Sequence, residues 1–118
     1  MEKVVVLMRK SPYGSVYPAE GFRTIMALAV FEMELNIVFM EDGVFTLVKD
    51  QKPEKLDMKP LGEGFPMLAE MNVKKFYAHQ GSLADRGLSP DGLVMKVDLL
   101  DDAGVAEVLA SATKILPF

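Results

Sequence analysis

Short, unbroken apolar runs leave this chain few folds to choose from. Residues 4–8 read Val-Val-Val-Leu-Met, and residues 36–40 read NIVFM. Strands of this composition are typical of a parallel sheet covered on both faces, because neither side of such a strand suits contact with water. Three further runs, 75–79 (KFYAH), 93–97 (LVMKV) and 114–116 (KIL), also read as strands. The sequence therefore predicts about five strands.

A helical spacing of apolar residues separates the first two of these runs. Large apolar side chains recur every three or four positions from Phe22 to Met33, and Pro18 and Glu20 suit the first turn of a helix. The spacing predicts one long helix that packs an apolar face against the sheet.

Four short helical segments and one loop complete the pattern. Asp42 is a candidate cap for a helical turn that extends to Val48, and Ser82 has the spacing to Asp85 of a capping box. The remaining predictions are a loop over 49–64, a short helix over 66–71 opened by Pro66, and a last helix introduced by Asp101 and Asp102.

Strands that alternate with helices predict a three-layer α/β/α fold with a mainly parallel sheet, because each parallel step needs a right-handed crossover. The chain has 118 residues. This length suits one domain, over residues 1–118, with a core of its own.

The charge of the chain and its lack of cysteine exclude several classes of function. The net charge is −4 and basic residues occur at most in pairs such as Arg9-Lys10, so direct nucleic-acid binding is not expected. Without cysteine, disulfides, thiolate metal sites and covalent sulfur chemistry on this chain are excluded. The apolar stretch at 4–8 is too short for a membrane span or a signal sequence, so a cytoplasmic protein is expected. No cofactor is expected either.

Sites in parallel sheets lie beyond the carboxyl ends of the strands. Three polar segments fall there: RKSPYGS, EDGV and HQGS. The candidate ligand-binding or interface residues are Tyr13, Gly14, Ser15, Tyr17, Asp42, Gly43, His79, Gly81, Ser82 and Arg86.

The SPYGS segment (11–15) has two interpretations. It lies between a strand and a helix, where backbone N–H groups could hold an anion. Its single glycine, however, does not match a dinucleotide or phosphate-loop motif. The alternative is a tight turn that needs Gly14, with Tyr13 and Tyr17 near an interface or the mouth of a pocket.

His79, the only histidine, could act as a general base or a metal ligand. Zinc is not expected, because no second histidine is available. A Ser-His-Asp triad could be built from Ser82, His79 and Asp42, but Ser82 is also needed as a helix cap and Asp42 suits a turn.

With its segments in this order, the sequence resembles the DsrE/DsrF-like family, in particular the DsrF/TusC branch of the sulfur-relay complexes. The resemblance rests on the first strand with SPYGS, the helix after it, FMEDGVFTLVKDQKP (39–53) and HQGSLADRGL (79–88). It implies a small α/β subunit that forms homo-oligomers or hetero-oligomers with DsrE- or DsrH-like subunits. It also implies a part in sulfur oxidation or in the 2-thiolation of tRNA uridine, where a cysteine carries sulfur as a persulfide.

The family cysteine lies in a pattern Cys-x-x-[Ser/Ala]-Leu-x-x-Arg-Gly. Here the pair is Arg86-Gly87, and His79 stands at the cysteine position. An imidazole cannot form a persulfide. One interpretation is a non-catalytic subunit that acts with a cysteine-bearing paralogue, whose persulfide His79 could polarise or hold. The other is a stand-alone homo-oligomer that binds a small anion between SPYGS and HQGS.

Overall fold

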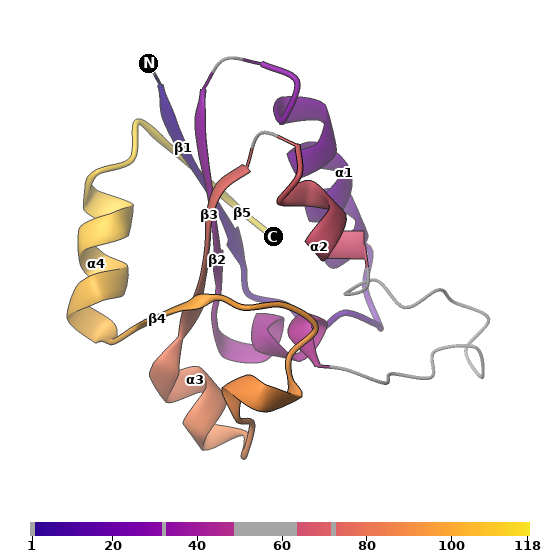
Figure 1. Cartoon of the computed structure of the whole chain (residues 1–118), viewed down its shortest axis with the longest axis vertical. Coiled ribbons are helices and arrows are strands. Elements are labelled where there is room, and N and C mark those ends of the chain that lie inside the picture. Colours follow the sequence, from indigo (N-terminus) through magenta and orange to yellow (C-terminus); the bar gives the residue numbers. More distant parts are fainter. Residues whose placement is uncertain (1, 32, 49–63, 72) are drawn as a thin grey trace.

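The computed structural model describes residues 2–31, 33–48, 64–71 and 73–118, so the predicted loop falls outside the description except for Gly64. Five parallel strands form one sheet in the order β4-β3-β2-β1-β5 (Figure 1). The strands are β1 (Lys3–Met8), β2 (Glu34–Phe39), β3 (Val73–His79), β4 (Asp98–Leu100) and β5 (Lys114–Pro117).

Helices cover both faces of the sheet. α1 and α2 lie on one face and α4 lies on the other, which confirms the predicted three-layer α/β/α fold (Figure 1). The helices are α1 (Tyr17–Leu28), α2 (Phe65–Leu68), α3 (Gln80–Asp85) and α4 (Asp102–Ala110), with 3-10 turns η1 (Glu41–Leu47) and η4 (Pro90–Gly92).

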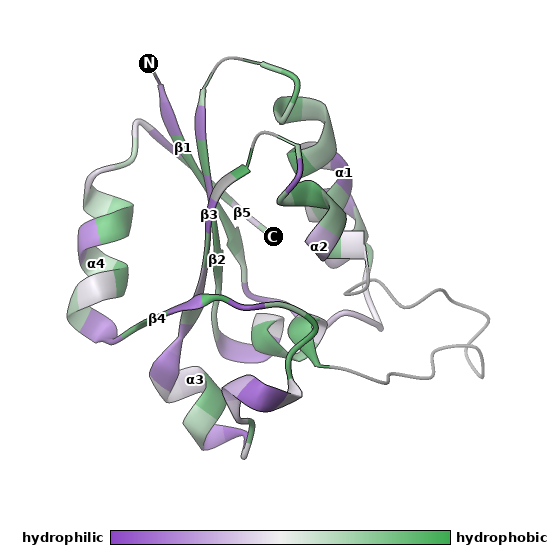
Figure 2. Ribbon diagram, viewed as in Figure 1, coloured by the Kyte–Doolittle hydropathy of each residue, from purple (hydrophilic) through white to green (hydrophobic). Residues whose placement is uncertain are grey.

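The main core lies between the sheet and the α1–α2 layer. Hydrophobic residues concentrate in the central strand β2, whereas α4 begins with hydrophilic residues (Figure 2). Phe39 of β2 meets Phe65 of α2 edge to face, with ring centroids 5.2 Å apart, and Phe65 meets Phe22 of α1 in the same way. Burial of each such ring contributes about 1.5–3 kcal/mol, so these contacts fix both helices onto the sheet.

The predicted strand over 93–97 is wrong, because β4 comprises only residues 98–100. The apolar run bonds to η1 instead. The Val94 N–H donates to the carbonyl oxygen of Leu47 at 2.7 Å, and Leu93 forms an antiparallel bridge with Val48. Backbone partners outside the run, rather than its composition, decide its conformation.

Two glycines shape the carboxyl edge of the sheet. Gly14 has φ +102°, which confirms a turn that needs glycine there. A Cβ on Gly43 would lie 1.9 Å from the carbonyl oxygen of Met8, so η1 approaches β1 too closely for any side chain.

The long helix predicted to extend to Met33 ends earlier, at Leu28.

Among the described residues, no helix combines the length and the apolar character needed to cross a membrane.

Candidate functional site

His79 ends β3 and precedes α3, at the carboxyl edge of the sheet where the sequence predicted it. The strand alternation directs Ala78 into the main core and His79 toward the α4 layer. The side chain of His79 is 16% exposed. The ring is therefore enclosed between the start of α3 and the start of α4.

Both ring nitrogens of His79 are engaged. Nδ1 accepts a hydrogen bond from the backbone N–H of Ser82 at 3.1 Å and lies 2.6 Å from Ser82 Oγ. Nε2 lies 2.5 Å from Oδ1 of Asp102, the first residue of α4. Because the Ser82 amide can only donate, Nδ1 is the acceptor of that bond, which leaves Nε2 to donate toward Asp102.

His79 is thus the cap of α3, and the prediction that Ser82 caps this helix is wrong. Ser82 lies inside the first turn and is buried, with 4% exposure. Its hydroxyl oxygen accepts the backbone N–H of Glu41 at 2.8 Å, a residue held at φ 51°. The hydroxyl therefore bridges η1 to His79 and is not presented to solvent as a nucleophile.

Asp42 has a different partner from the predicted one. The cap position of η1 is Met40 and carries no side-chain hydrogen bond, so the capping role predicted for Asp42 is wrong. Oδ1 of Asp42 accepts a hydrogen bond from Nε of Arg86 at 3.1 Å and forms an ion pair with its Nη2 at 3.0 Å. Arg86 also donates to the carbonyl oxygen of Ser82 at 3.2 Å and lies 6.0 Å from the ring centroid of Phe45.

A Ser-His-Asp arrangement exists, but its acid is Asp102 and not Asp42. Sequence reasoning missed Asp102 as a site residue. The available signal was its position, since Asp101 and Asp102 follow the strand that pairs with β3. Asp101 accepts the Gly104 N–H at 2.7 Å and caps α4, which leaves the Asp102 carboxylate for His79.

The other predicted residues lie in different places, and only one of them contacts His79. Gly81 lies against the His79 ring, where an added Cβ would come within 3.1 Å of Cε1, and so belongs to the site. Tyr13 lines a separate hollow of about 290 Å³ with Phe45 and Val48. Gly14, Ser15 and Tyr17 are exposed, and Gly43 is a buried residue of η1 that lies against Met8 of β1.

A second hollow, of about 420 Å³, lies beside His79 between α3 and α4. Its lining includes Gln80, Gly81 and the carboxylates of Asp101 and Asp102. Arg86, the nearby cation, is already paired with Asp42. This arrangement disfavours a small anion, because carboxylates repel it.

No described group of three histidine, aspartate or glutamate side chains is arranged to hold a metal ion. The imidazole of His79 is tied at both nitrogens, and no thiol exists in the chain. The site can connect η1, α3 and α4, but it cannot carry sulfane sulfur.

A parallel sheet with helices on both faces, and a polar cluster where β3 meets α3, defines a small α/β protein with a candidate site at the carboxyl edge of the sheet. More particularly, the chain belongs to the DsrE/DsrF-like family, whose model matches residues 2–118.

Relatives of known name agree with this membership. The chain is 28% identical to "Intracellular sulfur oxidation protein DsrF" of Allochromatium vinosum, an alignment that covers 100% of this chain and 97% of that one. It is 26% identical to "Protein TusC homolog" of Aliivibrio fischeri over the full length of both. Among solved structures, the ychN protein of E. coli shares the fold, with a TM-score of 0.78, 24% identity and full coverage of both chains.

Proposed function

We propose that this chain is a non-catalytic subunit of an intracellular sulfur-relay complex in which a cysteine-bearing paralogue carries the persulfide. One observation carries the proposal: the position of the family cysteine holds His79, with both ring nitrogens engaged. Accepting sulfane sulfur requires a thiolate, and the chain has no cysteine. The relatives named DsrF and TusC support the same role.

Exposed apolar side chains support a subunit rather than an isolated protein. Val30 is 73% exposed and Met67 is 51% exposed, on the layer that α1 and α2 form. Where such side chains lie together they mark a protein contact, whereas a single exposed apolar side chain does not. The exposed large apolar residues of this layer and its flanks are Val16, Tyr17, Met26, Val30, Phe31, Met67 and Met71.

The role of His79 in such a complex is mechanical. Its ring joins the start of α3 to the start of α4 and, through Ser82, to the backbone of η1. These three segments form the carboxyl edge of the sheet. His79 would therefore hold in shape the surface that faces a partner's sulfur-bearing cysteine. The alternative, a stand-alone homo-oligomer that binds a small anion between SPYGS and HQGS, has less support because Arg86, the cation beside HQGS, is already paired with Asp42.

Affinity purification from the native cells, with mass spectrometry of the recovered proteins, tests the proposal. The tag belongs at the amino end, because Phe118 is bonded to β1 through Leu7 and Arg9. We expect stoichiometric recovery of a cysteine-bearing paralogue. Recovery of a homo-oligomer alone would contradict the proposal.

A pair of variants sharpens the same experiment. Val30→Asp places a charge in the exposed turn after α1 and is expected to release the paralogue. Ile115→Asp, at a position with 42% exposure on the edge strand β5, is the matched control and is expected to retain it. Equal recovery with both variants would remove the α1–α2 layer as the contact surface.

A further inference from the structure

The first half of β3 has an open edge. β2 pairs with β3 from Val73 to Ala78, but β4 pairs only with Tyr77, Ala78 and His79. Within the described parts of the chain, residues 73–76 have no paired strand residue on the β4 side, because the ladder with β4 begins at Tyr77. Alternate N–H and C=O groups of a strand point toward that side, so they present unused hydrogen-bonding positions.

The segment before β4 leaves this edge uncovered for a specific reason. Val94 and Leu93 are held by Leu47 and Val48 of the η1 region, so the chain approaches β3 only at Asp98. β4 therefore pairs with less than half of β3.

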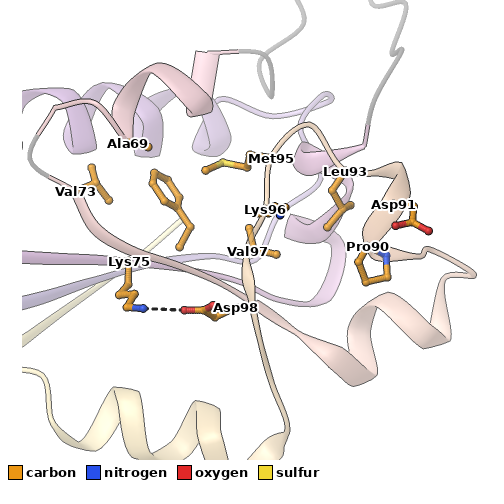
Figure 3. A pocket seen from close by; sticks show the side chains of 11 residues that line it. Ala69, Val73, Lys75, Pro90, Asp91, Leu93, Met95, Lys96, Val97 and Asp98 are labelled. Atoms are coloured by element: carbon orange, nitrogen blue, oxygen red, sulfur yellow. Dashed lines mark hydrogen bonds and ion pairs between the residues drawn. The ribbon is translucent and has the colours of Figure 1, made fainter.

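A hollow of about 490 Å³ follows the open edge (Figure 3). Val73 and Phe76, each 8% exposed, line it from β3, and Met95 and Val97 line it from the segment before β4. The space is large enough for an apolar side chain, and methionine adapts its shape to a ligand.

The charges at the rim cancel. Lys75 Nζ lies 3.1 Å from Asp98 Oδ2, and the lining also contains Lys96 and Asp91. Two lysines and two aspartates give the hollow no net charge, so a compact charged metabolite gains little there. The recognition elements that remain are the unused backbone positions and the apolar walls, which together suit an extended polypeptide.

We propose that an extended segment of a partner polypeptide adds to β3 along residues 73–76 and places an apolar side chain in the hollow. This mode of binding takes its affinity from main-chain hydrogen bonds and its specificity from the pocket for alternate side chains. The proposal is independent of the sulfur-relay role, because the edge lies away from His79 and makes no use of it.

The probe is a short, uncharged peptide of alternating leucine and threonine, titrated into isotope-labelled protein of full length. Amide signals and hydrogen exchange of residues 73–76 report binding. N-methylation of all leucines removes one set of alternate N–H groups, and N-methylation of all threonines removes the other. Strand addition predicts that one of the two methylated peptides binds about tenfold or more weakly than the other, whichever register is used.

Equal binding of the two methylated peptides would overturn the proposal, because a pocket that reads only side chains ignores N–H groups. Absence of any effect at residues 73–76 would overturn it as well. So would protection of these amides by rising concentration of the protein alone, which would make a second copy the occupant.

A variant pair tests the hollow. Met95→Asp places a charge in the wall and is expected to weaken peptide binding about tenfold, whereas Met26→Asp, on the exposed side of α1, is the matched control. If Met95→Asp does not fold, the two methylated peptides on the wild-type protein still decide the question.

Discussion

Nε2 of His79 lies 2.5 Å from Oδ1 of Asp102, and this contact joins the end of β3 to the start of α4. The two residues are 23 positions apart in the sequence. The contact uses the ring nitrogen that the Ser82 N–H leaves available. One imidazole therefore holds two helix starts together.

We expect His79→Ala to lower the free energy of unfolding by about 2 kcal/mol, because it removes the α3 cap and leaves the buried Ser82 without its acceptor. His79→Asn, which keeps an oxygen that can cap, should lose less. Chemical denaturation measures both. Equal stability of His79→Ala and the wild type would show that the hydrogen bonds of the ring contribute nothing net.

His79→Cys is expected to create a sulfur-accepting site. A thiolate there would face the Ser82 N–H that now donates to Nδ1, and a donated hydrogen bond favours the thiolate form. Cyanide-labile sulfur, assayed after incubation with a sulfur donor, should rise from none to a measurable fraction of the protein. Ala103→Cys, on exposed α4, controls for a thiol at any surface position. Equal loading of the two variants would mean that position 79 offers no special environment.

Gly43→Ala is expected to destabilise the protein by about 3 kcal/mol or more, because its Cβ would lie 1.9 Å from the carbonyl oxygen of Met8 and backbone must move. Gly92→Ala is the matched control, since nothing lies within 4 Å of its Cβ. Thermal unfolding of both variants checks the difference. Similar melting temperatures would mean that η1 can move away from β1 at little cost.

Lys75 provides a prediction for high pH. The hydrogen bond and charge of Asp98 raise the pKa of Lys75 above its usual value of 10.5. A raised folded-state pKa means that the stabilising contribution is complete below the unfolded pKa and is lost as pH rises through the folded one.

The stability difference between wild type and Lys75→Met should therefore be constant from neutral pH to about pH 10 and shrink above it. Denaturation midpoints across this range measure it, and added salt should reduce the difference at every pH because the pair is exposed. A difference that grows with pH would contradict the assignment.

Apolar composition correctly predicted the strands that are covered on both faces of the sheet. Val4–Met8 and Asn36–Phe39 lie in such strands, and nearly all of their side chains are buried. The same argument failed for 93–97, because Leu93 and Val94 satisfy their backbone on the η1 region, a partner that sequence spacing does not identify.

The position of the candidate site was predicted correctly, but the pairs that its side chains form were not. The sequence located His79 at the end of a strand, and it named Ser82, Asp42 and Arg86 beside it. The pairs that form are His79–Asp102 and Arg86–Asp42, and the cap of α3 is His79 itself. Caps depend on side-chain reach and on competing donors, so several local solutions fit one sequence pattern.

The order of apolar runs and the absence of cysteine were sufficient to establish a doubly covered parallel sheet and to exclude persulfide chemistry on this chain. The acid that pairs with His79, the length of β4 and the open edge of β3 were decided only in three dimensions. The physical reason is that apolar burial acts on every residue of a run, so its pattern can be recognised in the sequence. A hydrogen bond, by contrast, goes to whichever group the finished fold brings within about 3 Å.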